Sequence, residues 1–413
     1  MFKSSIENQQ YNNKKDMLIF SAIFLMLACL FISRAALSIS LIFFVALTCV
    51  HKNILEQAKA FITNKFLVAL SFLFIIPLIS GIWSSNKTEW LHILQVKLPF
   101  ILLPFSFSGK WRMNNHHWNI IGSFFIALTF AACCISTLFY LQNMQEVHAA
   151  YLKAKVLPTS FDNDHVRFSL AIAIAFFVCL FKLQKNISRK ENFILASLAL
   201  LFFVYLHLLS ARTGLVAAYF IFIAFSIKFL LNKTRRLFLL PALLIVPALS
   251  FFVFPTFQNR IKYLVYDFSY YKSNHYLPGA TDGNRILSIK AGSDILLKNP
   301  FGVGAGDIWD ETIEWYYESI PDMLPTDQLY PSSEWLMYGT MMGWLGIIGF
   351  SIILFYPLFI KMTRFRFEWI LLNLVLISSI VFDTGLGTQY GIFLHLISLL
   401  LWWKNYSIEA KPS

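Results

Sequence analysis

Long runs of apolar residues follow one another along almost the whole chain, and they decide what it can fold into. Of the 413 residues, 57% are hydrophobic and only 14% are charged, whereas soluble domains carry close to a quarter charged residues. A bilayer core of about 30 Å requires about 20 apolar residues for each helix that crosses it. The sequence therefore excludes a soluble globular domain and predicts an all-α, polytopic integral membrane protein.

About twelve transmembrane helices are expected from these runs, within a single membrane domain that covers residues 1–413. The second and the last two runs are short for a membrane crossing. The expected spans are 17–33, 36–50, 66–84, 91–107, 118–141, 166–183, 192–209, 213–231, 236–254, 336–360, 368–382 and 389–403.

Lys and Arg are distributed unevenly over the connections between these spans. Alternate connections, together with both termini, hold most of them, and loops of this kind remain in the cytoplasm. We therefore expect a multi-pass protein of the bacterial inner membrane with both termini cytoplasmic. The net charge of +12 follows from this asymmetry, so the sequence requires no nucleic-acid partner.

One long hydrophilic stretch, residues 255–335, separates the ninth and tenth spans. It carries half of the 22 acidic residues, and the charge distribution places it outside as a large periplasmic loop, which we call the lid. Residues 284–298 have apolar positions at helical spacing and end at Asn299-Pro300, which predicts an amphipathic helix. A second short helix is expected at 309–320. A membrane protein with such a loop on one side usually binds or converts its substrate there.

Four cations occupy positions where a charge is costly unless it has a partner or a function. Lys97 is in the middle of a span, Arg167 and Arg212 are near outer span ends, and Arg285 begins the lid helix. Together they suit a doubly charged anion such as pyrophosphate, because Arg offers a planar fork to phosphate oxygens. Alternatively, Arg167 and Arg212 anchor the interface, Lys97 pairs with a carboxylate such as Asp383, and Arg285 is solvated.

The lid also contains a glycine run, with Gly302, Gly304 and Gly306 at alternate positions. The run is similar to part of a dinucleotide-binding fingerprint, but it follows no strand of a βαβ unit. We interpret it instead as a tight turn that brings the backbone close to another segment.

Several separated motifs, spread from Lys97 to Gln389, together resemble the O-antigen ligase and polymerase superfamily. Each is weak alone, but they occur in the family's order, with one large outer loop before the tenth span. The motifs are Lys97-Leu98-Pro99 with Pro104, Asp164-His165-Val166-Arg167-Phe168-Ser169, Ser210-Ala211-Arg212-Thr213-Gly214, Asn284-Arg285 through the glycine run, and Asp383-Thr384-Gly385-Leu386-Gly387-Thr388-Gln389.

This resemblance implies a membrane-embedded, C-type glycosyltransferase that needs no metal or other cofactor. Its donor would be a glycan on undecaprenyl pyrophosphate, and its acceptor either a second glycan or lipid A-core. The enzyme would serve lipopolysaccharide or exopolysaccharide synthesis at the periplasmic face, as a ligase or as a polymerase. Arg212 and Arg285 would hold the pyrophosphate and stabilise the charge that grows on it, with Lys97 and Arg167 acting on the same anion.

The sequence departs from the family at the residue proposed as catalytic base. The family has a histidine where the lid meets the tenth span, but this chain has Ser332, which cannot act as a base at neutral pH. We expect Glu334, or else Asp327, to replace it, because carboxylates are common general bases. His165 in the other outer connection and His275 in the lid are further candidates.

A transporter or flippase for lipid-linked sugar or another anion is the alternative to glycan transfer. Twelve spans and a cationic cavity would suit it, but the chain has no evident internal repeat of the kind found in many transporters. A non-catalytic scaffold in polysaccharide assembly is a third hypothesis, which predicts that removing Arg212 or Arg285 leaves glycan length unchanged.

Overall fold

The computed structural model describes residues 14–51, 53–152, 155–185, 188–230, 236–272 and 276–407. Over these residues the chain is helical, and the only β-pairing is an isolated bridge between Met362 and Ser407. The all-α prediction is therefore confirmed. The expected cytoplasmic termini lie largely outside the described residues, as does His275.

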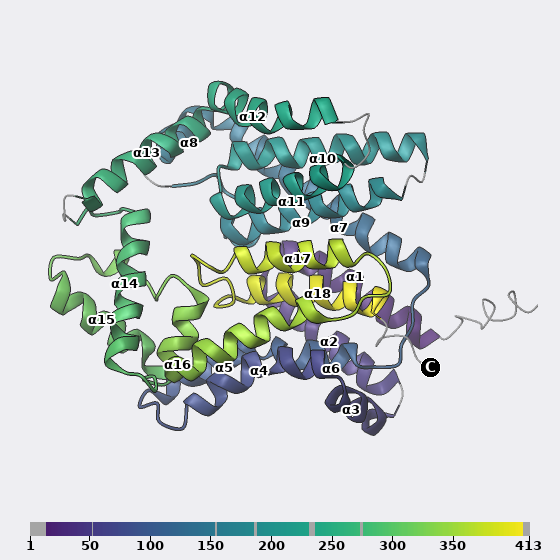
Figure 1. The fold of residues 1–413 in the computed structure, drawn as a ribbon, viewed down its shortest axis with the longest axis horizontal. Helices are drawn as coiled ribbons and strands as arrows, with labels where there is room; N and C mark the ends of the chain where they lie inside the picture. Colours follow the sequence, from purple (N-terminus) through teal and green to yellow (C-terminus); the bar gives the residue numbers. More distant parts are fainter. Residues whose placement is uncertain are drawn as a thin grey trace, which may run out of the picture.

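Most helices run roughly parallel or antiparallel in one bundle (Figure 1). Each of the twelve expected spans coincides with a helix of the bundle or with a helix pair. The bundle helices are α1 (Lys14–Ile32), α2 (Arg34–His51), α3 (Ile54–Thr63), α4 (Lys65–Ser80), α5 (Lys87–Lys97), α6 (Pro99–Phe107), α7 (Asn115–Gln142), α8 (Met144–Tyr151), α9 (His165–Gln184), α10 (Arg189–Leu209), α11 (Arg212–Leu230), α12 (Arg236–Val253), α16 (Glu334–Phe355), η3 (Tyr356–Phe359), α17 (Arg366–Ser378) and α18 (Gln389–Tyr406).

Six segments of the described chain are long and apolar enough to cross a bilayer, which makes this a multi-pass membrane protein. A seventh results if the bent pair 34–63 counts as one span. The other expected spans remain predictions. The six segments are Lys14–Ile32, Lys87–Phe107, Asn115–Gln142, His165–Gln184, Arg189–Leu209 and Glu334–Phe359.

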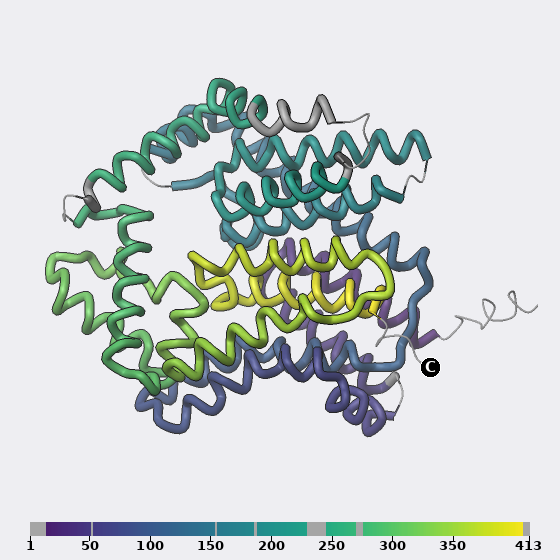
Figure 2. The backbone as a smooth tube through the Cα atoms, viewed as in Figure 1, coloured from purple at the N-terminus to yellow at the C-terminus, as the bar shows by residue number. Residues whose placement is uncertain are grey.

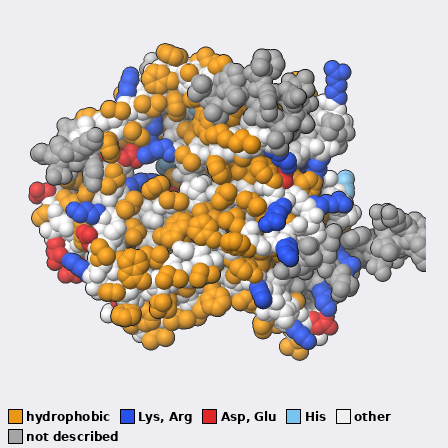
Figure 3. Space-filling model, viewed as in Figure 1, with side chains coloured by type: hydrophobic (Ala, Val, Ile, Leu, Met, Phe, Trp, Pro, Cys, Tyr) orange, Lys and Arg blue, Asp and Glu red, His pale blue; other side chains and the backbone are white. Residues whose placement is uncertain are grey.

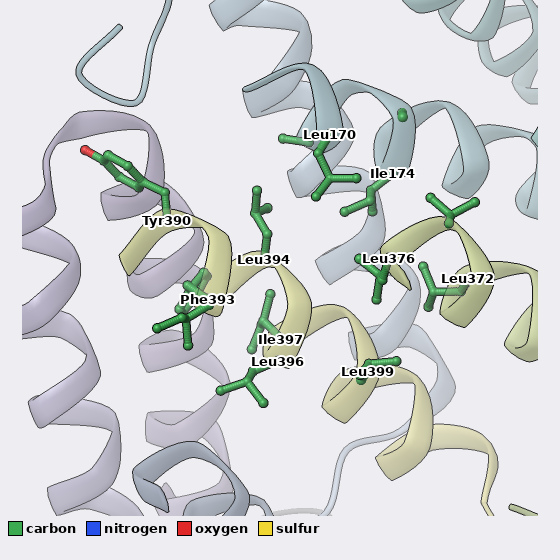
Figure 4. Packing of buried hydrophobic residues seen from close by; sticks show 14 of the residues in the cluster. Leu170, Ile174, Leu372, Leu376, Tyr390, Phe393, Leu394, Leu396, Ile397 and Leu399 are labelled. Carbon is green, nitrogen blue, oxygen red and sulfur yellow. The ribbon is translucent and has the colours of Figure 1, made fainter. Parts of the chain in front are cut away.

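The core lies where α9, α17 and α18 meet. Leu170 and Ile174 of α9 face the apolar side chains of α18, with Leu372 and Leu376 of α17 beside them (Figure 4). On the surface, apolar side chains form a broad band across the middle of the molecule, and Lys and Arg gather at the end away from the lid (Figure 3). This distribution is typical of a protein whose middle is surrounded by lipid.

The lid consists of three helices and two short 3-10 turns. These are α13 (Pro255–Lys272), α14 (Asp282–Lys298), η1 (Ala305–Asp307), α15 (Ile308–Ser319) and η2 (Pro325–Asp327). Both short helices expected in the lid are present, and α13 is an addition that the sequence pattern did not predict. In Figure 2, α14 crosses the ends of the bundle helices, and the chain then passes through α15 before α16 begins.

Candidate functional site

The first turn of α14 is held by a carboxylate from the preceding helix. Asp267 of α13 is buried, and its two oxygens accept hydrogen bonds from the backbone N–H groups of Thr281 at 3.0 Å, Asp282 at 2.7 Å and Gly283 at 3.1 Å. These N–H groups have no partner within the helix, and the partial positive charge at the helix start favours an anion. Asp267 therefore fixes the position from which α14 presents Arg285.

A cavity of about 540 Å³ lies between the start of α14, the start of α11 and the loop that follows α17. The structure brings Arg212 and Arg285 together here, because both line this cavity. The other lining residues are Thr213, Val216, Leu264, Phe268, Asp282, Ile286, Ile289, Ser378, Ser379, Val381, Phe382 and Asp383.

Each arginine of the cavity already faces a carboxylate. Arg212 forms an ion pair with Asp282, and Arg285 Nη1 lies 4.0 Å from Asp383 Oδ1 and donates to the carbonyl of Phe382 at 3.2 Å. Neither arginine is fully buried, with side-chain exposures of 43% and 34%. The guanidinium groups are thus oriented by the protein while their remaining N–H donors stay accessible from the cavity.

Arg167 supports the same cluster from the start of α9. It is 8% exposed, and its guanidinium lies 3.2 Å from Asp383 Oδ2 and 3.5 Å from Asp164 Oδ1. It also donates to the carbonyl of Thr384 at 2.5 Å. Asp383 therefore lies between Arg167 and Arg285, and the alternative that Arg167 is a snorkelling anchor does not fit this buried position.

Lys97 and Glu334 lie buried outside the cavity lining, at 3% and 1% exposed. Their opposite charges attract each other, but these two described side chains form no ion pair, and both bind the backbone of Leu386. Lys97 Nζ donates to Tyr338 Oη at 3.2 Å and to the carbonyl of Leu386 at 3.3 Å, while Glu334 Oε1 accepts from the N–H of Leu386 at 2.5 Å. The carboxylate that accompanies Lys97 is thus Glu334, whereas the sequence had offered Asp383. Lys97 ends α5 at a break that Pro99, the first residue of α6, imposes on the span.

Ser332, at the position of the family's histidine, and the candidate base Asp327 both bind other parts of the protein. Ser332 is buried, and its hydroxyl is 2.7 Å from that of Ser288 on α14. Asp327, in η2, accepts hydrogen bonds from the hydroxyl of Tyr276 and from the N–H of Gly279, the latter at 2.7 Å. Burial and this bond to Asp327 raise the pKa of Tyr276 to about 12. Both residues therefore brace the lid.

His165 is the candidate base whose surroundings belong to the cavity. It is the first residue of α9, and the charged groups that interact with it are Arg260, Arg285, Asp383 and Arg167. In contrast, the Glu334 carboxylate is almost inaccessible. The charges of Arg167 and Asp383 reach both candidates, but His165 is partly exposed whereas Glu334 lies within the packed interior.

The glycine run attaches the lid to a broken turn of α16. Met342 and Gly343 interrupt this helix, with φ of 66° at Gly343, and such a break frees backbone groups that need partners at membrane depth. The N–H groups of Val303 and Gly304 donate to the carbonyls of Thr340 and Met341 at 2.8 and 3.1 Å.

Two further positions of the run also require glycine. Gly302 has φ of 81°, and a Cβ there would collide with the backbone of 341–343, whereas a Cβ at Gly306 would collide with the backbone of Asn86. Asp307, directly after the run, accepts from the N–H groups of Ser85 at 2.6 Å and Asn86 at 2.7 Å. These contacts agree with the expectation that the glycine run brings the backbone close to another segment.

Arg260, Asp267 and Asp282 belong to the site but were not singled out from the sequence. Arg260 of α13 has a buried Nη1 without a hydrogen-bond partner among the described residues. Burial, and after it the charge of Arg212, lower the pKa of Arg260. In the sequence Arg260 follows an apolar run, as many ordinary polar residues do, so no sequence pattern indicated its role. The only sequence feature that could have indicated Asp282 is its position three residues before Arg285.

Unsatisfied polar atoms are concentrated around the cavity. Buried polar atoms in native proteins nearly always have a partner, so exceptions indicate a function or a bound molecule. Several buried side-chain atoms in this region have no hydrogen-bond partner among the described residues: Arg167 Nε, Arg260 Nη1, Thr281 Oγ1, Asp282 Oδ2 and Asn284 Oδ1. Within the described ranges, no three His, Cys, Asp or Glu side chains are grouped as metal ligands are.

The fold and this cavity define a multi-pass membrane protein with a charged site beneath a helical lid. Residues 195–351 match the O-antigen ligase family. This match confirms the O-antigen ligase and polymerase superfamily that the sequence motifs indicate, and it implies a membrane enzyme that ligates or polymerises glycans. The matched segment includes Arg212, Arg260, Arg285 and the glycine run. No curated protein matches the chain.

Proposed function

We propose that this protein is a C-type glycosyltransferase that takes a glycan from undecaprenyl pyrophosphate at the periplasmic face of the inner membrane. The glycan is ligated to an acceptor or polymerised onto a second lipid-linked glycan. The single observation that carries the proposal is that Arg212 and Arg285, from distant parts of the chain, line one cavity. The family match over 195–351 supports the reaction class.

The charges of the cavity suit a pyrophosphate leaving group. The charged side chains that line the cavity are those of Arg212, Arg285, Asp282 and Asp383, and Arg167 adds a positive charge beside Asp383. The carboxylates keep the guanidinium groups oriented before substrate arrives, so little reorganisation is needed when charge develops on the diphosphate. Stabilisation of that charge by fixed donors is the largest contribution that such a site makes. We propose that the cavity stabilises the charge on the diphosphate without a metal ion.

The rest of the cavity wall suits the polyprenyl chain. Val216 of α11 and Phe382 at the cavity edge are 58% and 71% exposed, and Leu264, Phe268 and Ile286 continue the apolar surface. Exposed apolar side chains beside a charged site are expected where a lipid carries the charged group. The donor would thus place its diphosphate between the arginines and its isoprenoid tail against these side chains.

The reaction requires a base for the acceptor hydroxyl. As the acceptor oxygen forms a bond to the sugar C1, the bond from C1 to the pyrophosphate oxygen breaks and the electron pair leaves with undecaprenyl pyrophosphate. The base takes the hydroxyl proton. We propose His165 for this role, because it lies among the charged groups of the cavity. Glu334, the preference from sequence, is the alternative, and its burial argues for a positioning role.

Reconstitution tests the proposal directly. The purified protein in nanodiscs is incubated with a lipid-pyrophosphate-linked glycan and an acceptor, and the expected result is a longer glycan together with free undecaprenyl pyrophosphate. Nanodiscs enclose no compartment, so a flippase would give no product in this assay, and such a result with folded protein would overturn the proposal. In a deletion strain, long chains left on the carrier indicate a ligase, and single repeats indicate a polymerase.

A further inference from the structure

A second cavity lies at the opposite end of the bundle from the lid. It has a volume of about 130 Å³ and is enclosed by α1, α7, α9, α17 and α18. Leu27, Phe125, Ile174 and Leu372 line its inner end, whereas its outer end reaches Lys182 and Lys185. The active-site cluster does not extend to it, because Arg167 is at the start of α9 and Lys182 is at the end of that helix.

The shape of this cavity is that of a narrow apolar groove. Its α9 wall runs from Ile174 to Lys185, about 16 Å at 1.5 Å per residue. Aromatic rings of Phe177, Phe181 and Trp402 line the groove along this length. An apolar lining that extends over this length fits an unbranched hydrocarbon chain better than a compact ligand.

The two lysines give the outer end an unbalanced positive charge. Lys182 is buried, and its ammonium donates to the carbonyl of Asn119 at 2.8 Å and to the hydroxyl of Ser123 at 2.5 Å. An ammonium has three donors, so one remains. Lys185 lies 4.7 Å from the ring centroid of Phe181. Neither lysine forms an ion pair with a carboxylate in the part of the chain that the structure describes.

We propose that this groove binds one acyl chain of an anionic phospholipid from the leaflet opposite the lid, with the lipid phosphate on Lys182 and Lys185. The apolar walls and the cationic end match the two parts of such a lipid and their order along the membrane normal. Basic residues near an anionic leaflet are attracted to its lipids. The site is distinct from the glycan-transfer cavity and does not depend on the proposed reaction.

Gly122 of α7 keeps the groove open. A Cβ at this position would make only ordinary contacts, 3.4 Å from Lys182 Cε and 3.5 Å from Val178 Cγ1. The helix therefore tolerates a side chain here, and a leucine would extend into the groove and occupy the space of the acyl chain. Gly122→Leu thus removes the tail site, whereas Lys182→Gln removes the headgroup site.

Native mass spectrometry of the purified full chain tests this proposal. Phosphatidylglycerol and phosphatidylcholine with the same acyl chains are titrated separately. We expect phosphatidylglycerol to bind roughly tenfold more tightly, as one to two cationic contacts would give. Lys182→Gln should abolish this preference, and Gly122→Leu should weaken the binding of both lipids.

Two control variants match these changes away from the groove. Lys190→Gln removes an exposed lysine at the same end of the bundle, and Gly349→Leu adds a side chain to α16, where a Cβ would meet only Ile76 at 3.5 Å. Both should bind the two lipids as the unmodified protein does. Equal affinity for the two lipids, or an undiminished preference in Lys182→Gln, would overturn the proposal. Inorganic phosphate that competes fully with phosphatidylglycerol would also overturn it, since the site would then bind only an ion.

Discussion

Arg212 and Asp282 form an ion pair that joins the start of α11 to the start of the lid helix α14. The pair lies in the wall of the cavity that also contains Arg285 and Asp383. The orientation of one guanidinium therefore depends on the position of the lid, and the lid is held in turn by Asp267. The position of the Arg212 charge in the cavity thus depends on the structure of the lid.

Removing either cavity arginine should abolish most of the transfer activity. We expect Arg212→Ala and Arg285→Ala to lower kcat by about 10²–10³-fold, because each removes a fixed donor to the developing diphosphate charge. The measurement is glycan transfer in nanodiscs. Lys290→Ala is the matched control, since Lys290 is an exposed cation on the same helix as Arg285, and it should keep full activity. Normal transfer by folded Arg285→Ala would contradict the assigned role.

Asp267→Asn should destabilise the lid. The amide keeps one acceptor oxygen but places an NH₂ group against backbone donors, and an unsatisfied buried group costs about 1–3 kcal/mol. Thermal unfolding should therefore begin at a lower temperature, and KM for the donor should rise because Arg285 loses its fixed position. Asp322→Asn, in an exposed lid loop, should change neither quantity. Unchanged unfolding of Asp267→Asn would show that another group holds the first turn of α14.

Two glycines of the lid allow the cost of backbone strain to be measured separately from the cost of a steric collision. Gly279 and Gly302 both have positive φ, at 75° and 81°, but a Cβ at Gly279 meets nothing within 4 Å, whereas one at Gly302 collides with the backbone of α16. We expect Gly279→Ala to cost about 1–2 kcal/mol from backbone strain alone, and Gly302→Ala to cost substantially more. Comparing unfolding midpoints in the same detergent checks this. Equal losses would mean that the contact between the lid and α16 adjusts easily.

His165→Gln and Glu334→Gln distinguish a base from a positioning residue. We expect His165→Gln to lower kcat by about 10²-fold or more, as loss of a general base does, with little change in unfolding temperature. Glu334→Gln should instead lower the unfolding temperature, because the buried charge of Lys97 loses its counter-charge, while kcat changes by only a few fold. A folded Glu334→Gln protein without activity, beside an active His165→Gln protein, would restore the sequence-based preference for Glu334.

Asp327→Asn tests the remaining carboxylate. Because Asp327 binds Tyr276 and Gly279, the substitution should reduce stability by about 1 kcal/mol and leave transfer within a few fold of normal. The readouts are unfolding temperature and the transfer rate under saturating donor. A large loss of kcat at unchanged stability would place Asp327 among the catalytic groups instead.

The helices and the principal cations were predictable from the sequence, because apolar runs are local and a charge next to such a run is conspicuous. Arg212 and Arg285 were selected in this way. Asp282 was not, since an acidic residue in a hydrophilic loop has no local mark of its tertiary contact. Asp383 was considered from the sequence as a partner of Lys97, whereas its partners in the structure are Arg167 and Arg285. Arg260 was missed for the same reason as Asp282. The glycine run indicated a close backbone contact, but only the fold revealed that its partner is the interrupted turn at Gly343.

Asp267 joins two helices within the lid. The lid is joined to the bundle by Val303 and Gly304 at the turn of α16 and by Asp307 at the loop before α5. Contacts at two separate places oppose a movement of the lid away from the bundle. In the proposed reaction, the lipid-linked donor would enter laterally, from the hydrocarbon phase past Val216, and its glycan would extend toward water. The lipid carrier and the saccharide would thus leave the cavity in perpendicular directions, so that release of the lipid need not wait for release of the saccharide.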